Sequence, residues 1–172
     1  MVEPGTHRFE PGNATLSVRT RRGGAAAKAG HDLLLHVTAW EGTLTIGDDG
    51  APSAAELVAD ATSLRVQEGT GGMKALDDDD KANIHQTIDD EVLQRRDIAF
   101  RSSAIDGGRA DGELTIGDRT RPLSLELEVA DDGTVRASAT VRQSDWGVKP
   151  YSALFGTLKV LDEVEVALEG HL

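Results

Sequence analysis

The stretch Leu123-Ser124-Leu125-Glu126-Leu127-Glu128-Val129 alternates apolar and polar residues without a break. Successive side chains of a β-strand point to opposite faces, so this pattern predicts a strand with one buried and one solvated face. We expect the four aliphatic side chains of this stretch to face the protein interior. The serine and the two glutamates should face water.

The same alternation returns along most of the chain. Further candidate strands lie at 16–18, 33–37, 40–46, 57–59, 98–100, 114–116, 135–141 and 158–168. Turn-forming residues separate some of them, as in Gly47-Asp48-Asp49-Gly50 and Asp131-Asp132-Gly133. Eight or nine strands joined by short turns predict an all-β fold, either an antiparallel barrel or a sandwich.

The segment from Leu76 to Leu93 departs from this alternation. Its apolar residues Ile84, Ile88 and Val92 recur every four residues, which places them on one face of a helix. Asp77–Asp80 supply side-chain oxygens and negative charge at the N-terminal end of that helix. We therefore expect one inserted helix, with its apolar face turned toward the sheet.

The stretch Glu68-Gly69-Thr70-Gly71-Gly72 precedes this helix and indicates a flexible connector. Two interpretations of the helix stay open at this point. It is a plug that covers one end of the core, or it is a gate over a ligand cavity.

Composition limits the classes of function. A length of 172 residues fits a single domain spanning 1–172, and the absence of cysteine excludes thiol catalysis and cysteine-based metal sites. A net charge of −12 and only six aromatic residues disfavour nucleic acid as a partner. The first residues form no apolar run and no stretch is long enough to span a membrane, so we expect a cytoplasmic protein without a signal peptide.

Three stretches in the second half of the chain carry a family resemblance. They are Ile98-Ala99-Phe100-Arg101-Ser102, then Asp111-Gly112-Glu113-Leu114-Thr115-Ile116 followed by Thr120-Arg121-Pro122-Leu123, and finally Val141-Arg142-Gln143-Ser144-Asp145-Trp146-Gly147-Val148 followed by Asp162-Glu163-Val164. In this order they resemble the YceI-like family. The resemblance implies an eight-stranded antiparallel lipocalin-like barrel, whose internal tunnel can hold a long isoprenoid or fatty-amide chain. It implies no hydrolytic or redox activity.

The polar residues offer little support for catalysis. His31 and His36 are an odd number of residues apart, so on one strand they point to opposite faces and do not share a metal. Ser144-Asp145 lacks the glycines of a nucleophile elbow, which leaves a hydrolase unsupported. No catalytic residue, metal or cofactor is therefore expected.

Two polar positions are candidates for binding the head group of a ligand. His31 opens an apolar strand at a barrel rim, where it binds either a head group or local backbone groups. Arg19 belongs with Arg21 and Arg22 to the one dense basic cluster of the chain. That cluster is either an exposed hairpin end or a contact for an anionic group at the mouth of a tunnel.

The sequence therefore predicts a non-enzymatic binding protein that stores, sequesters or delivers a long hydrophobic molecule. Two alternatives stay open: a barrel filled by its own side chains that acts as an interaction or stress-response module, and an enzyme acting on an apolar substrate through His31 and Asp32. The expected partner is a hydrophobic small molecule, and self-association as a homodimer is left open. The side chains expected to contact the ligand are Leu33, Leu35, Val37, Trp40, Ile84, Ile88, Phe100, Trp146, Tyr151, Leu154 and Phe155.

Overall fold

A computed structural model describes residues 2–153, 156 and 158–172. Within these residues the chain forms an 11-stranded antiparallel sheet and a separate three-stranded sheet. The strands of the large sheet are β1 (Gly5–Phe9), β2 (Ala14–Thr20), β4 (His31–Val37), β5 (Trp40–Ile46), β6 (Pro52–Ala59), β7 (Leu64–Gly71), β8 (Ile98–Asp106), β9 (Arg109–Ile116), β10 (Arg119–Val129), β11 (Thr134–Arg142) and β14 (Glu163–His171). Those of the small sheet are β3 (Arg22–Gly23), β12 (Ser152–Ala153) and β13 (Leu158–Val160).

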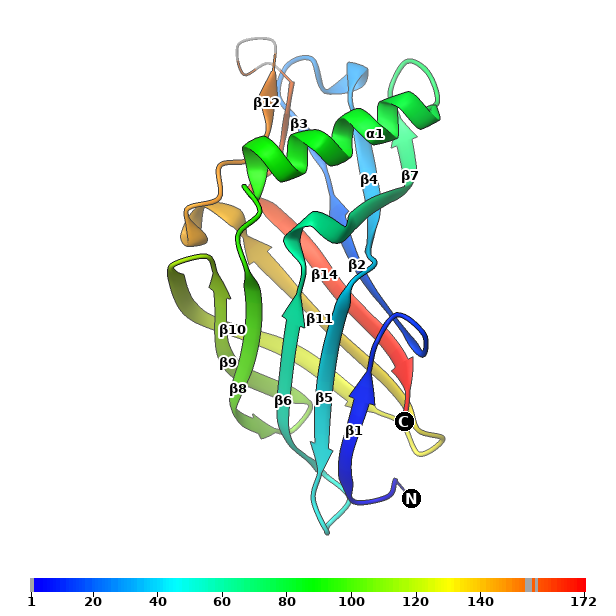
Figure 1. Ribbon diagram of the computed structural model, residues 1–172, viewed down its shortest axis with the longest axis vertical. Helices are drawn as coiled ribbons and strands as arrows, with labels where there is room; N and C mark the ends of the chain where they lie inside the picture. Colours follow the sequence, from blue (N-terminus) through cyan, green and yellow to red (C-terminus); the bar gives the residue numbers. More distant parts are fainter. Residues whose placement is uncertain (1, 154–155, 157) are drawn as a thin grey trace.

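The large sheet curls around an apolar interior (Figure 1). Its strand order is β1-β5-β6-β8-β9-β10-β11-β14-β2-β4-β7. The chain passes from β4 to β5 through Thr38 and Ala39 alone, and thereby crosses from one end of this order to the other. Two walls of the curled sheet are therefore joined directly by the chain.

The expected count of eight strands was wrong. In the large sheet, the two strands without a counterpart in the alternation are β1 and β7, and these are its two edges. Their residues are mostly exposed, so they lack the buried face that produces a regular alternation of apolar residues. The predicted strand over 158–168 is also divided, into β13 of the small sheet and β14 of the large one.

A short 3₁₀ turn, η2 (Ala61–Ser63), separates β6 from β7 and bends the sheet. The carboxylate of Asp60 caps this turn by accepting a hydrogen bond from the backbone N–H of Thr62 at 2.8 Å. Two backbone hydrogen bonds, Thr38 N to Ser63 O at 2.9 Å and Asp60 N to Ala39 O at 3.0 Å, hold the facing bend between β4 and β5. The segment β4–β5 pairs with the segment β6–β7, and the two segments thus bend at the same point.

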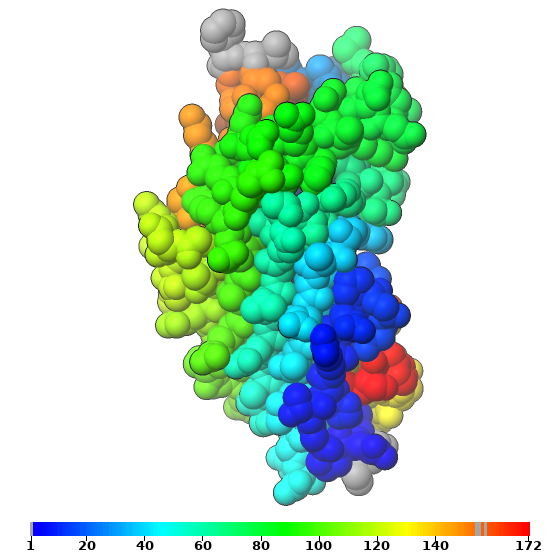
Figure 2. All heavy atoms as spheres, viewed as in Figure 1, coloured from blue at the N-terminus to red at the C-terminus, as the bar shows by residue number. Residues whose placement is uncertain are grey.

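The single expected helix is present as α1 (Asp78–Thr87), which continues into a π-helical turn, η3 (Ile88–Val92). Asp77 and Asp80 form a reciprocal capping box at its start, as the aspartate run predicted. The helix lies across one end of the curled sheet, and in the space-filling view its side chains cover the upper part of that face (Figures 1 and 2).

The glycine-rich stretch is not a free connector, because Gly69 and Gly71 belong to β7. A Cβ atom at Gly69 would collide with the side chain of Leu76, which packs there just before α1. Gly71 and Gly72 have φ angles of +81° and +72°, a region that favours glycine. These glycines therefore end the strand and leave room for close packing.

The core confirms the register expected for β10. Leu127 is buried, and Leu123, Leu125 and Val129 on the same face are half-buried. Ser124, Glu126 and Glu128 on the other face are exposed. Most buried apolar residues form one cluster between the walls of the curled sheet. A second cluster surrounds Trp146, toward the end where α1 lies.

Candidate functional site

An apolar cavity of about 290 Å³ lies between the walls of the curled sheet. Its walls are the inward-facing aliphatic side chains of β2, β4, β5, β6, β8, β9, β10, β11 and β14, with η3 beside them. Such a lining offers dispersion contacts and makes few hydrogen-bonding demands on an occupant. The volume lies near the lower limit of the usual 300–1,000 Å³ range for ligand pockets.

Small side chains account for the empty space. Ala55 and Ala59 on β6, and Ala137 and Ala139 on β11, occupy inward positions along the cavity. At such positions other strands carry leucine, isoleucine or valine, which fill the interior. Each alanine lacks the outer carbon atoms of a larger aliphatic side chain, so the four alanines together leave a hollow.

The end of the helical segment supplies part of the cavity wall. Ile88, Val92 and Leu93 line the cavity from η3 and the residue after it. The buried side chain of Asp89 lies on the same turn, with its Oδ2 3.3 Å from His85 Nε2. Within the described part of the chain, Asp89 Oδ1 has no hydrogen-bond partner.

His85 connects the helix to the bend of the sheet. Its Nε2 lies 2.8 Å from the carbonyl oxygen of Thr62 and 2.7 Å from a guanidinium nitrogen of Arg65. A few polar contacts around η2 therefore hold the helical segment whose η3 turn lines the cavity.

The polar side chains turned toward the cavity lie near one end of it. Thr20 is the last residue of β2, on the face of Leu16 and Val18, and its Oγ1 is buried without a partner among the described residues. Gln143 follows β11, and its Nε2 donates a hydrogen bond to the carbonyl of Leu161 at 3.2 Å.

The residues expected to contact a ligand fall into several groups. Leu35, Val37, Ile88 and Phe100 line the cavity. Trp40 and Trp146 are buried in the two core clusters, Leu33 packs at the edge of the larger cluster, and neither Ile84 nor the exposed Tyr151 belongs to the lining. Leu154 and Phe155 lie outside the described residues.

The two candidate head-group residues lie elsewhere. His31 Nε2 is 2.7 Å from the carbonyl of Lys74, a backbone contact as one of its two interpretations expected, although with a residue 43 positions away and not with a local one. Arg19 stands one position from Val18 on β2 and so points to the outer face of the sheet. Neither residue lines the cavity.

Several lining residues were missing from the expected ligand contacts. Phe9 comes from the edge strand β1, whose sequence shows no alternation. Leu44, Val164, Val166 and Leu168 were assigned to strands but not to a site. Their alternation could have marked them as inward-facing, whereas the position of the hollow could not be found without the fold.

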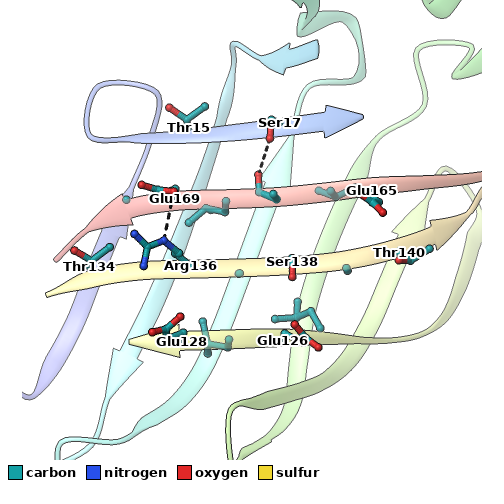
Figure 3. Close-up of a pocket in the computed structure, with 18 of the residues that line it drawn as sticks. Thr15, Ser17, Glu126, Glu128, Thr134, Arg136, Ser138, Thr140, Glu165 and Glu169 are labelled. Carbon is teal, nitrogen blue, oxygen red and sulfur yellow. Dashed lines mark hydrogen bonds and ion pairs between the residues drawn. The ribbon is translucent and has the colours of Figure 1, made fainter. Parts of the chain in front are cut away.

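A larger and open hollow of about 1660 Å³ lies on the outer face of the sheet (Figure 3). The small side chains Ser17, Ser138 and Ala167 lie next to one another across β2, β14 and β11. Charged residues flank them, including Arg136 and Glu169, which form an exposed ion pair at 3.5 Å. Charged and polar side chains line much of this surface, whereas the lining of the inner cavity is almost entirely apolar.

The serine–aspartate–tryptophan–glycine run of the family motif has a structural role. The backbone N–H of Ser144 donates to Asp162 Oδ1 at 2.8 Å, and its hydroxyl donates to Asp162 Oδ2. The indole N–H of Trp146 donates to the carbonyl of Leu114 at 2.7 Å. Gly147 then ends the turn with a φ of +69°. The motif thus locks β11 to the start of β14 beside the cavity.

Hydrogen bonds lower the pKa values of four aspartates. Hydrogen bonds from Thr62 lower the pKa of Asp60, and a backbone hydrogen bond from Asp80 lowers that of Asp77. Asp111 and Asp132 also have lowered pKa values, through hydrogen bonds from Ser124 and from Thr134 respectively.

The described residues contain no cluster of three or more metal-ligating side chains. Within the same residues, no helix has the length and apolarity needed to cross a membrane.

Comparison with known proteins agrees with this architecture. A sequence model of the YceI-like domain matches residues 11–172. No curated protein matches the chain. The crystal structure of Burkholderia cenocepacia BcnA superposes with a TM-score of 0.65 over 91% of this chain and 94% of that one, at 16% sequence identity. At that identity the likeness shows a shared fold.

Proposed function

This chain belongs to the YceI-like family, and from that premise we propose that it binds a long-chain hydrophobic molecule, such as an isoprenoid or a fatty-acyl derivative, inside its curled sheet. The observation that carries the proposal is the cavity, whose inward side chains are apolar, most of them aliphatic, apart from Thr20 and Gln143. Binding of this kind suits storage, sequestration or delivery of the molecule.

The chemistry of the lining favours a long apolar chain. Each methylene group that leaves water for an apolar site contributes about 0.8 kcal/mol, so affinity should rise with chain length until the cavity is full. A carboxylate or phosphate inside the cavity would meet no cationic side chain. The charged end of an amphiphile would therefore remain outside.

The size of the cavity bears on the mechanism. A volume of about 290 Å³ is small for a long isoprenoid, so the cavity has to widen when such a chain enters. The helical segment α1–η3 is the element we propose to move. It lines the cavity through Ile88 and Val92, and its attachment to the sheet includes the contacts of His85 with Thr62 and Arg65.

We also propose that the chain binds its ligand without converting it. The serine of the family motif is engaged by Asp162, and His31 is engaged by a backbone carbonyl. Neither lines the cavity, so a bound apolar chain would not meet them.

Isothermal titration calorimetry on delipidated protein tests the proposal. A panel of prenyl alcohols and fatty amides of increasing length should bind with rising affinity and a negative heat-capacity change, because apolar surface leaves water. The matched variants are Ala55→Leu, which fills the cavity, and Ala54→Leu, which adds the same atoms at an exposed position of β6. We expect Ala55→Leu to weaken binding and Ala54→Leu to bind like the wild type.

Two results would contradict the proposal. Absence of binding across the whole panel would favour a self-filled interaction module. Equal binding by both variants would place the ligand outside the cavity, on a surface such as the outer hollow of β10, β11 and β14.

A further inference from the structure

Two short segments carry a charge opposite to that of the chain. Residues 21–30 and 149–161 contain five cationic residues and no aspartate or glutamate. The cationic residues are Arg21, Arg22, Lys28, Lys149 and Lys159. All 30 acidic residues of a chain with net charge −12 therefore lie elsewhere.

The fold brings these two segments together. Strand β13 pairs with β3, with Lys159 opposite Gly23, and Leu161 N donates to the carbonyl of Arg21 at 2.8 Å. Strand β12 pairs with β13, with Ser152 opposite Lys159. The described residues of the two segments thus form one unit, which we call the basic tip. It projects at the end of the molecule opposite both chain termini (Figure 1).

Most of the positive charge of the basic tip is available to a partner. Arg22 is used internally, since its guanidinium donates to the carbonyls of Gly30 and Thr70 at 2.8 and 3.2 Å. The other four cationic side chains belong to exposed residues, and none lies within ion-pair distance of a carboxylate in the described part of the chain.

Exposed apolar side chains accompany these charges. Tyr151 and Leu161 of the basic tip are each 39% exposed, and Met73, on the neighbouring turn between β7 and α1, is 86% exposed. These are three of the four large hydrophobic residues found exposed among the described residues. Cationic and apolar groups therefore share one end of an otherwise acidic molecule.

We propose that the basic tip docks on the surface of an anionic lipid membrane. Lysine side chains attract anionic head groups, while tyrosine and aliphatic side chains enter the interfacial region, so both features of the tip are used. An acidic protein would satisfy the charges but would not need the exposed apolar groups around them. The acidic remainder of the chain is repelled by the same surface, so the molecule docks with the tip foremost.

The acidic first turn of α1 restricts the contact area. Asp78, Asp79 and Asp80 lie at the same end of the molecule as the basic tip, although on a separate element. Their repulsion confines the contact to the side of β3, β12 and β13. The proposed docking depends only on the cationic and exposed apolar side chains of the basic tip. It requires no ligand in the cavity.

Vesicle flotation tests the inference. The full-length protein is mixed with vesicles of equal parts phosphatidylcholine and phosphatidylglycerol, or of phosphatidylcholine alone. We expect binding to the anionic vesicles only, and its loss when the salt concentration is raised. Neutralising one interfacial lysine should weaken binding about fivefold, and neutralising three should weaken it about 100-fold.

The variants separate the tip from the general charge of the protein. The test variant is K28Q/K149Q/K159Q, and the control, with the same change in net charge on β8, β9 and β11, is R101Q/R109Q/R136Q. Tyr151→Ser should weaken binding without removing its dependence on salt. Circular dichroism checks that each variant is folded.

The inference is overturned if the protein ignores anionic vesicles, or if the test variant and the control bind them equally. Selective retention on beads coated with polyglutamate, without vesicle binding, would assign the tip to an acidic protein partner and would also overturn it. Because the assay uses protein without added ligand, its failure leaves the proposed cavity function standing, and the reverse holds as well.

Discussion

Replacing Ile88 by alanine separates a gate from a plug. Ile88 lies on η3, lines the cavity and packs against the main core cluster while remaining partly exposed. The substitution removes three carbon atoms. Their transfer from water contributes at most about 2.4 kcal/mol, at about 0.8 kcal/mol for each group.

The neighbouring cavity lowers this cost. A large-to-small change at a closed site costs about 2–5 kcal/mol, because the lost transfer energy is joined by a term for the new void. Ile88 already borders open space, so the void at that position adds little. We therefore expect the free energy of unfolding to fall by about 2 kcal/mol or less, with faster release of a bound chain.

Ile46→Ala is the matched control. Ile46 is 2% exposed, lies in the same core cluster and does not line the cavity. The same three carbons removed there should cost about 2–5 kcal/mol, more than at Ile88, and leave the release rate unchanged.

Thermal and denaturant unfolding of ligand-free protein gives the two stability losses, and stopped-flow release of a fluorescent prenyl lipid gives the rates. A gate is excluded if Ile88→Ala costs as much stability as Ile46→Ala while lipid release keeps its wild-type rate. The helix would then be a plug.

Three further predictions concern the bend, the motif and the start of the helix. Hydrogen bonds from Thr62 lower the pKa of Asp60 below its usual 3.8, so the stability they add is present above that pH and is lost as the pH falls through the lower folded pKa; acid unfolding curves of Asp60→Ala should show a weaker decline below pH 3.8 than the wild type. Trp146→Phe leaves a buried carbonyl of β9 without its donor, and should lower the free energy of unfolding by about 1–3 kcal/mol in urea titrations. Gly69→Ala should displace Leu76 and loosen the start of α1, so lipid release should be faster; an unchanged rate would show that this packing does not restrain the helix.

Much of the architecture could be predicted from the alternation of apolar residues. That signal exists wherever a strand has one buried and one solvated face, and it predicted the interior face of β10 correctly. It failed at β1 and β7, since edge strands bury too little to show a period. It separated β4 from β5, as candidate strands at 33–37 and 40–46, but could not show the bend between them, because the bend at Thr38 and Ala39 depends on contacts with a distant turn.

The candidate site was less predictable than the fold. Aliphatic residues at inward positions look alike in sequence, whether they fill a core or surround a hollow. The difference arises where Ala55 and Ala59 lie on one wall and Ala137 and Ala139 on another, and that relation between β6 and β11 exists only in three dimensions. Arg19 was misplaced for a different reason. It is adjacent to the inward-facing Val18 on β2, but its own side chain lies on the outer face of the sheet.

Recovery of an apolar molecule from the purified protein would show directly whether the cavity holds a ligand. Purified wild-type protein and the cavity-filling variant Ala55→Leu are extracted with denaturing solvent, and the extracts are analysed by mass spectrometry. We expect the wild type to release one class of long-chain hydrophobic molecule in near-stoichiometric amount and Ala55→Leu to release much less. An extract free of such molecules, or equal amounts from both proteins, would contradict the proposed function.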